Sequence, residues 1–286
     1  MSTHICIYHK DCSDGTSSAA VFLKKFPDAK IFPLDHGYTQ EEAEHILSQI
    51  PHNSVVYTLD CALLVRELLD QGNEVITLDH HISVQENMKT LAASEPRFTY
   101  FFRNDLSGAT LAWNYFFPNQ VVPYWLTLVQ DKDLWTNLFP ESDLLVNWTY
   151  TQRNKPENLL TLFEDEAFVT KALEAGKIID GLNREYVDSF KKKAKPLLMQ
   201  YEKYLIPVYN STYLQSILGN VLADPDLGVT IIFSIRGSDI YMSVRSVTDS
   251  KVSALEVAQS FGGGGHRNAA GCKITFEEFI TQVRTR

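Results

Sequence analysis

Cysteine is scarce in this 286-residue sequence, and the spacing of the cysteines indicates neither a disulfide framework nor a zinc knuckle. The four cysteines are Cys6, Cys12, Cys61 and Cys272. None of them belongs to a Cys-x-x-Cys pair, and their wide spacing is not that of a disulfide-stabilised secreted domain. We therefore expect a protein of a reducing compartment, with a cytoplasmic location.

The sequence also has no basic, apolar and small-residue pattern of a secretory signal at its start. It contains no apolar run near the roughly 18 residues that cross a bilayer. We therefore expect neither secretion nor membrane association.

Positive charge is in deficit, because 26 Lys and Arg face 35 Asp and Glu, for a formal net charge of −9. Such a chain repels polyanions unless cations gather locally, so a broad basic face for long duplex nucleic acid is not expected. The basic run Lys191, Lys192, Lys193 and Lys195 ends a predicted helix, where cations complement the helix dipole. We favour that role for the run over nucleic-acid binding.

A hydrophobic content of 44% with 21% charged residues is typical of a folded protein, and the length suggests about two domains. Short apolar runs alternate with helical patterns over the first 80 residues, which predicts an α/β fold with a doubly wound, mainly parallel sheet. A long helix over about 168–195 then connects to a smaller α/β domain. The predicted domains are 1–167, a connector over 168–205, and 206–286.

Acidic and imidazole side chains follow three of the predicted parallel strands. His9 and Asp14 come after the first strand, Asp60 after the third, and His80 and His81 after the fourth. Carboxyl ends of parallel strands converge on the crevice where ligands bind, and carboxylates gathered there repel one another unless a cation compensates them. Asp and His together suit Mn, Fe, Zn or Mg, and two ions bridged by a carboxylate form a hydrolytic centre for phosphate esters. Any one of these residues alone could equally be a helix N-cap or turn residue.

Four segments resemble motifs of the DHH phosphoesterases, and they occur in the family's order. They are Tyr8-His9-Lys10-Asp11-Cys12-Ser13-Asp14-Gly15, Thr58-Leu59-Asp60, Thr77-Leu78-Asp79-His80-His81 and Val129-Gln130-Asp131-Lys132-Asp133-Leu134-Trp135. The resemblance implies two divalent ions, with Mn first and Mg, Fe or Zn as alternatives. It implies the metal ligands His9, Asp14, Asp60, His80 and Asp131, and we add Asp11 as a candidate ligand next to the departing position.

Within that set the resemblance makes Asp60 the bridging ligand, and His81 a residue that orients a ligand or contacts the scissile phosphate. Asp131 ranks before Asp133, and either of the two could instead cap or pair a helix. One position departs from the family, because Cys12 stands where the motif has an Asp. Either Asp11 replaces that ligand, or Cys12 contributes a thiolate, or the first ion is held more weakly.

A second candidate site lies in the glycine-rich stretch 261–271, which holds five of the 14 glycines. Consecutive glycines cost folding free energy, but they allow close backbone approach and N–H groups that cradle a phosphate. The stretch resembles the substrate-binding motif of the C-terminal domain that accompanies DHH domains. The substrate-binding candidates are Gly263, Gly264, Gly265, His266, Arg267 and, on an upstream strand, Arg245. A flexible loop, and for Arg245 a solvated strand position, are the alternatives.

These observations predict a metal-dependent phosphodiesterase with His81 and Asp60 as catalytic residues. Because the sequence has few basic residues and no evident binding surface for a long strand, we expect short substrates. The enzyme would hydrolyse short oligonucleotides or linear dinucleotides, such as the pGpG-like products of cyclic dinucleotide turnover, to mononucleotides. The alternatives are a single-strand exonuclease of the same family and a non-catalytic nucleotide-binding module. A homodimer is compatible with the sequence but nothing specifies one.

Overall fold

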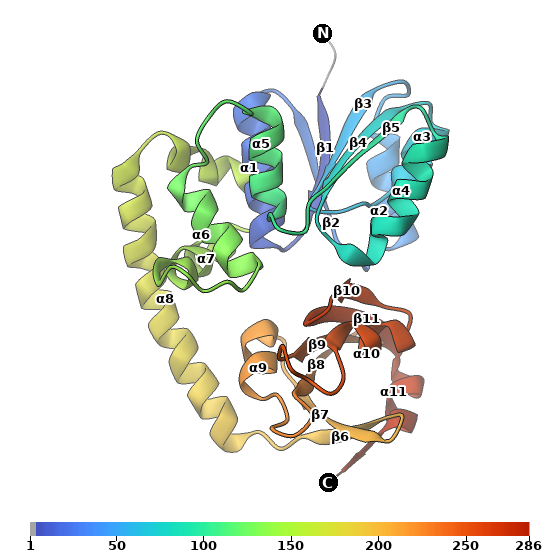
Figure 1. Ribbon diagram of the computed structural model, residues 1–286, viewed down its shortest axis with the longest axis vertical. Coiled ribbons are helices and arrows are strands. Elements are labelled where there is room, and N and C mark those ends of the chain that lie inside the picture. Colours follow the sequence, from blue (N-terminus) through green and yellow to red (C-terminus); the bar gives the residue numbers. More distant parts are fainter. Residues whose placement is uncertain (1–3, 286) are drawn as a thin grey trace. The chain divides into compact units, whose positions relative to one another are not determined.

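The computed structural model describes residues 4–285 (Figure 1). The chain divides into two compact units between Gly181 and Leu182. This division falls inside the long helix α8 (Glu166–Lys193), which lies close to the helix predicted over 168–195. Each half of α8 therefore belongs to a different unit, and a separate connector over 168–205 stays a prediction. The outermost ends of the predicted domains, residues 1–3 and 286, lie outside the described residues.

The N-terminal unit contains a five-stranded sheet in the order β2-β1-β3-β4-β5. Its strands are β1 (Ile5–His9), β2 (Lys30–Leu34), β3 (Val55–Leu59), β4 (Glu74–Asp79) and β5 (Phe98–Phe102). All neighbouring pairs are parallel. The chain moves from β1 to β2 on one side and then to β3 on the other, so the carboxyl ends of β1 and β3 flank the switch point where α/β sheets bind ligands.

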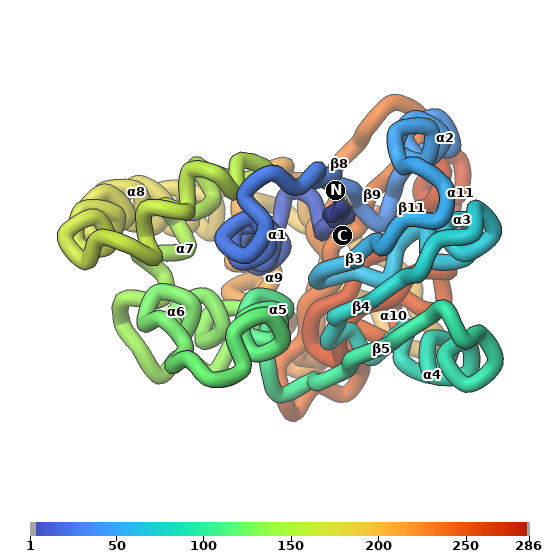
Figure 2. The backbone as a smooth tube through the Cα atoms, turned by 90° about the horizontal axis from the view of Figure 1, so that it is seen from above, coloured from blue at the N-terminus to red at the C-terminus, as the bar shows by residue number. Residues whose placement is uncertain are grey.

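Helices cover both faces of this sheet, as Figure 2 shows. Alternate residues of β1 enter different cores. Cys6 and Tyr8 pack with α1 (Ser13–Lys25) and α5 (Gly108–Phe116). Ile5 and Ile7 pack with α2 (Gln40–Ser48), α3 (Val65–Asp70) and α4 (Gln85–Ser94). A strand buried on both faces is apolar along its whole length, which is why these strands are apolar runs rather than alternating patterns. The predicted doubly wound α/β fold is confirmed.

The helices of this unit follow the strands in the order that the sequence predicts. They are α1 (Ser13–Lys25), α2 (Gln40–Ser48), α3 (Val65–Asp70), η1 (Ile82–Val84), α4 (Gln85–Ser94), α5 (Gly108–Phe116), α6 (Tyr124–Asp133), α7 (Glu141–Thr151) and η2 (Pro156–Phe163). The capping box of Thr39 and Glu42 fixes the start of α2, and the Ser107 side chain caps α5.

The C-terminal unit is built on a seven-stranded sheet in the order β10-β11-β9-β8-β7-β6-β12. Its strands are β6 (Leu197–Tyr201), β7 (Tyr204–Asn210), β8 (Val229–Arg236), β9 (Asp239–Ser246), β10 (Gly264–His266), β11 (Ala269–Thr275) and β12 (Val283–Thr285), and its short helices are α9 (Gln215–Val221), α10 (Ala254–Ser260) and α11 (Phe276–Gln282). Only β7 and β8 pair in parallel among these strands. The main core of this unit packs one face of the sheet against α10 and α11.

A search of the described helices for a segment long and apolar enough to cross a bilayer finds none.

Candidate metal centre

Asp60 lies at the centre of a buried polar cluster at the carboxyl ends of β1, β3 and β4. It follows β3 directly, its backbone has a φ of 57°, and its side chain is 1% exposed. Its Oδ2 atom lies 3.2 Å from Nδ1 of His9, and its Oδ1 atom lies 3.0 Å from Nε2 of His80. The two oxygens of one carboxylate thus face two different imidazoles, which is the arrangement of a bridging ligand.

A first group of ligand atoms, which we call the Asp133 group, comprises Asp14, His80 and Asp133. Nε2 of His80 lies 3.8 Å from Oδ2 of Asp14 and 3.6 Å from Oδ2 of Asp133. One ligand atom from each residue lies within 4.8 Å of the others. Together with Oδ1 of Asp60, this side of the cluster offers one nitrogen and three carboxylate oxygens.

The N-terminus of α5 holds Asp14 in place. The backbone N–H of Gly108 donates to Oδ2 of Asp14 at 2.5 Å, and that of Ala109 donates to Oδ1 at 3.0 Å. A Cβ atom on Gly108 would lie 2.6 Å from Cβ of Asp60, so only glycine lets the helix approach this closely. Sequence reasoning did not single out Gly108; the Ser-Gly pair at a helix start was the available signal.

The second group, which we call the Cys12 group, comprises His9, Cys12 and Asp60, again with ligand atoms within 4.8 Å of one another. Asp11 lies elsewhere: its N–H donates to Asn154, whose amide donates back to the Asp11 carboxylate at 2.7 Å, and Arg153 lies 3.6 Å away. Of the alternatives left open by the first motif, the structure places Cys12 in the cluster and turns Asp11 away. Burial and the charge of Asp60 raise the pKa of the Cys12 thiol to about 11.

Asp131 is not among the residues that the structure brings together, and Asp133 takes that place. The Asp131 carboxylate accepts hydrogen bonds from the hydroxyls of Thr136 and Ser142 and from the N–H groups of Leu138 and Phe139. Although burial raises its pKa, these donors hold it below the ordinary value of a carboxyl. Asp131 thus fixes the end of α6 and the loop before α7. This corrects the ranking of Asp131 before Asp133.

His81 is oriented by Asp79, whose Oδ1 atom lies 2.7 Å from Nδ1 of His81. A carboxylate on one imidazole nitrogen fixes the tautomer and directs the other nitrogen, as in many metal and catalytic sites. The His36 ring, which sequence reasoning missed, lies beside it: ring centroids are 5.7 Å apart from His81 and 4.8 Å apart from His9. His36 follows β2, so the rule of strand ends could have found it.

Three close carboxylates without a cation force protons onto the cluster. Burial and the charges of Asp60 and Asp133 raise the pKa of Asp14 well above its ordinary value. Burial lowers the pKa of His80, but Asp133 and Asp60 outweigh it and raise that pKa to about 10. For Asp60, hydrogen bonds to His80 and His9 outweigh burial and hold the pKa well below its usual range. Divalent ions would balance the same charges without protons.

The residues present fit such ions. Among residues 4–285, the buried Oδ2 atom of Asp133 accepts no hydrogen bond, although it points to His80. A buried carboxylate oxygen without a hydrogen bond is costly unless an ion or water meets it. Imidazole, carboxylate and thiol donors at these spacings are the ligands of Mn, Fe and Zn sites.

The glycine-rich stretch of the C-terminal unit is largely a strand rather than an open loop. Gly264 to His266 form β10, which pairs with β11 at the edge of the sheet. A Cβ atom on Gly263 would lie 2.1 Å from the carbonyl oxygen of Gly271, so close backbone packing requires glycine here. The edge side of β10 remains the place where backbone N–H groups could meet a phosphate.

The register places His266, Ala269 of β11, Arg245 of β9 and Thr230 of β8 in one row across the sheet. Arg245 packs against α9: its guanidinium donates to Oγ of Ser216 at 2.6 Å and to the carbonyl of Val244 at 2.9 Å. Arg267 lies in the turn between β10 and β11. The structure therefore gathers Arg245, His266 and Arg267 near one end of the sheet.

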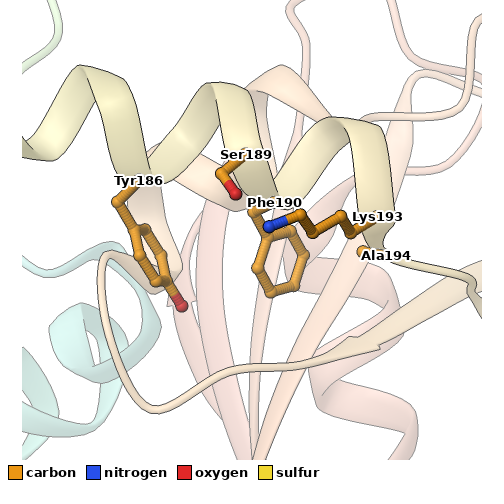
Figure 3. A pocket seen from close by; sticks show the side chains of 5 residues that line it. All are labelled: Tyr186, Ser189, Phe190, Lys193 and Ala194. Carbon is orange, nitrogen blue, oxygen red and sulfur yellow. The ribbon is translucent and has the colours of Figure 1, made fainter.

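A hollow of about 260 Å³ lies beside the C-terminal half of α8. Figure 3 shows the residues that line it, which are Tyr186, Ser189, Phe190, Lys193 and Ala194. None of the predicted site residues lines it. Its aromatic side chains pack toward the core formed with α9, so the predicted chemistry lies elsewhere.

Comparisons with known proteins decide the identity of the C-terminal unit. The family profile described as "DHHA1 domain" matches residues 203–286. This part of the chain is a DHHA1 domain. An uncharacterized protein of Acanthamoeba polyphaga mimivirus is 29% identical over 93% of this chain, and the match covers 66% of that protein.

Solved structures agree with the fold of the whole chain. RecJ of Thermus thermophilus, in complex with Mn²⁺, matches with a TM-score of 0.57 and 16% identity, over 97% of this chain and 50% of RecJ. An exonuclease RecJ bound to manganese matches with a TM-score of 0.53 and 17% identity, over 98% of this chain and 88% of that one. The family match thus confirms the predicted accompanying domain at residues 203–286, and the RecJ structures share the fold of the chain. The chain spans about two thirds of its mimivirus relative and half of the Thermus enzyme.

Proposed function

We propose that this chain is a metal-dependent phosphodiesterase that hydrolyses short oligonucleotides or linear dinucleotides, such as pGpG-like products of cyclic dinucleotide turnover, to mononucleotides. The observation that carries the proposal is the position of Asp60, whose two oxygens face His9 on one side and His80 on the other. The DHHA1 domain and the RecJ-like fold support it.

Two divalent ions bound there would supply Lewis-acid stabilisation of phosphate oxygens and a nucleophile at neutral pH. The protein's own residues would prepare the site for them. Asp60 would hold both ions, α5 would fix Asp14 through two backbone N–H groups, and Asp79 would orient His81. His81 would then donate to the scissile phosphate as negative charge develops on it.

The DHHA1 domain would bind the substrate through the edge of β10 and the adjacent cations. Backbone N–H groups of Gly264 and Gly265 would approach a phosphate closely, and His266 and Arg267 would supply charge. The N–H of Gly263 already donates to the carbonyl of Ala258 at 2.8 Å, so Gly263 would contribute only its close backbone approach. Arg245 would join them by exchanging its bond to Ser216 for a bidentate phosphate contact.

Charge favours a short substrate. The chain has a formal charge of −9, and a few phosphates need only the cations named above. A single-strand exonuclease is the second candidate, because the RecJ structures share the fold, but a long strand needs a basic or aromatic track.

The test is hydrolysis of labelled oligonucleotides of two to six nucleotides, and of strands of about 20 nucleotides, with Mn²⁺ and with chelator. We expect dinucleotides to be cleaved fastest, chelator to stop turnover, and Asp60→Ala to be inactive. Faster trimming of the long strands would favour the exonuclease. Binding without turnover in every metal tested would leave only a nucleotide-binding module.

The matched variant for substrate capture is His266→Ala. We expect it to raise KM and to leave kcat nearly unchanged, because His266 would touch substrate and not the reacting centre. A fall in kcat with an unchanged KM would contradict this role.

A further inference from the structure

We infer that the two ion sites of this centre are chemically different, so that the Cys12 group selects a thiophilic ion such as Zn²⁺ while the Asp133 group takes Mn²⁺ or Mg²⁺. The inference rests on the proposed function, because it names the metal chemistry of that same site. It adds that the centre is a mixed-metal one in which the thiolate of Cys12 is a ligand.

The donor atoms of the two groups differ in kind. The Cys12 group offers an imidazole nitrogen from His9, sulfur from Cys12 and one oxygen from Asp60. The Asp133 group offers the His80 nitrogen with oxygens from Asp14, Asp133 and Asp60. Thiolate selects Zn and other soft or borderline ions, whereas carboxylate-rich sites suit Mn and Mg.

Cys12 is placed to serve as this ligand. It is the N-cap residue of α1, but its side chain makes no capping hydrogen bond. The N-terminus of this 13-residue helix favours a negatively charged sulfur. The alternative oxygen donor, Asp11, is held away by Asn154 and Arg153.

Formation of the site exchanges a proton for an ion. Cys12 loses its S–H proton to solvent, a sulfur–metal bond forms, and no oxidant or reductant is needed. The bound ion is Zn²⁺ before and after the step.

The first experiment offers the full chain equimolar Zn²⁺ and Mn²⁺, removes unbound ions, and counts bound metal by mass spectrometry. We expect one Zn and one Mn per chain. In Cys12→Asp, which has the carboxylate of the family motif, Zn²⁺ affinity should fall by more than about 10-fold and Mn should occupy both sites. Cys272→Ala, which removes a cysteine of the DHHA1 domain, should match the wild type.

The second experiment replaces Zn²⁺ with Co²⁺ and records the absorption spectrum. We expect a thiolate-to-cobalt charge-transfer band in the wild type and in Cys272→Ala, and none in Cys12→Asp. Bound cobalt without this band, or equal Zn-to-Mn ratios in wild type and Cys12→Asp, would overturn the inference.

The two proposals fail differently. If Mn²⁺ fills both sites of the wild type and supports hydrolysis, the proposed function stands and the thiolate site does not. If neither Zn²⁺ nor Mn²⁺ binds the folded wild type, both are wrong.

Discussion

Two aspartates two positions apart on α6 have different tasks at the scale of single residues. Asp131 accepts four hydrogen bonds and is a structural residue, whereas the buried Oδ2 atom of Asp133 points to His80. Sequence alone ranked them in the opposite order, because both residue type and motif position fit either one. What separates them is which donors lie nearby, and this depends on the loop after α6.

Asp131 and Asp133 should therefore respond differently to substitution by asparagine. Asp131→Asn should lower the free energy of unfolding by about 1.5–3 kcal/mol, the range for hydrogen bonds to a charged group, in urea titrations without metal. Asp133→Asn should leave that free energy unchanged or raise it, because burial of this carboxylate, which raises its pKa, outweighs its attraction to His80. It should abolish Mn²⁺-dependent turnover. Equal stability losses in the two variants would show that both carboxylates are structural.

Binding of Mn²⁺ should release the proton that His80 carries in the metal-free fold. The pKa of His80 in the metal-free fold is raised from 6.5 to about 10, chiefly by Asp133 and Asp60 against the effect of burial. A raised pKa stabilises the folded state fully below 6.5, and this stabilisation is lost as pH rises toward 10. A metal ligand must be neutral, so Mn²⁺ should displace this proton and bind more tightly as pH rises from 7 to 9. Calorimetry in buffers of different ionisation enthalpy measures the release; no release at pH 7 would contradict it.

At the scale of elements, α5 does more than cover the sheet. Its first two N–H groups fix Asp14, and Gly108 lets it touch Asp60. The helix N-terminus thereby stabilises negative charge at the end of β3 and in α1.

Gly108→Ala should therefore damage the site. The new methyl group would lie 2.6 Å from Cβ of Asp60 and would displace that carboxylate or α5. We expect Mn²⁺ affinity to fall and turnover to be lost. Gly181→Ala is the matched control, because its Cβ meets nothing within 4 Å in α8, and it should stabilise the protein by about 0.5–1 kcal/mol. Titration calorimetry measures the Mn²⁺ affinity of both variants, and thermal unfolding measures their stability. Unaltered Mn²⁺ binding in Gly108→Ala would contradict this prediction.

The elements of the first unit could be predicted well because each strand is an apolar run that ends in polar residues. The run Lys30–Leu34 coincides with β2, and the sequence also places Asp60 and His80 at strand ends. α1 begins at Ser13, four residues before the helical pattern that starts at Ser17, because contacts between distant segments hold its first turn: α5 binds Asp14, and the Ser13 hydroxyl lies 2.5 Å from that of Thr149 in α7. The sequence does not predict that the glycines form a strand, because the tight pairing of β10 with β11 leaves no local signal.

At the scale of the whole chain, the predicted metal ligands lie in one unit and the predicted phosphate-binding residues in the other. The ligand atoms of the Cys12 and Asp133 groups come from residues 9–133, and the DHHA1 domain spans residues 203–286. The two units have separate hydrophobic cores. The free energy of ion binding should therefore stabilise one unit, and that of substrate binding the other.

Manganese should accordingly stabilise the first unit and leave the DHHA1 domain unchanged. An ion at 100 times its Kd adds about 2.7 kcal/mol to the stability of the state that binds it. Hydrogen exchange with mass spectrometry, with Mn²⁺ and with chelator, should show slower exchange in peptides from β1, β3, β4 and the start of α5. Peptides from residues 203–286 should exchange at the same rate in both conditions. Equal protection of both units would mean that they unfold as one. Asp60→Ala removes the predicted bridging carboxylate, so any protection that comes from these ions should be absent in this variant.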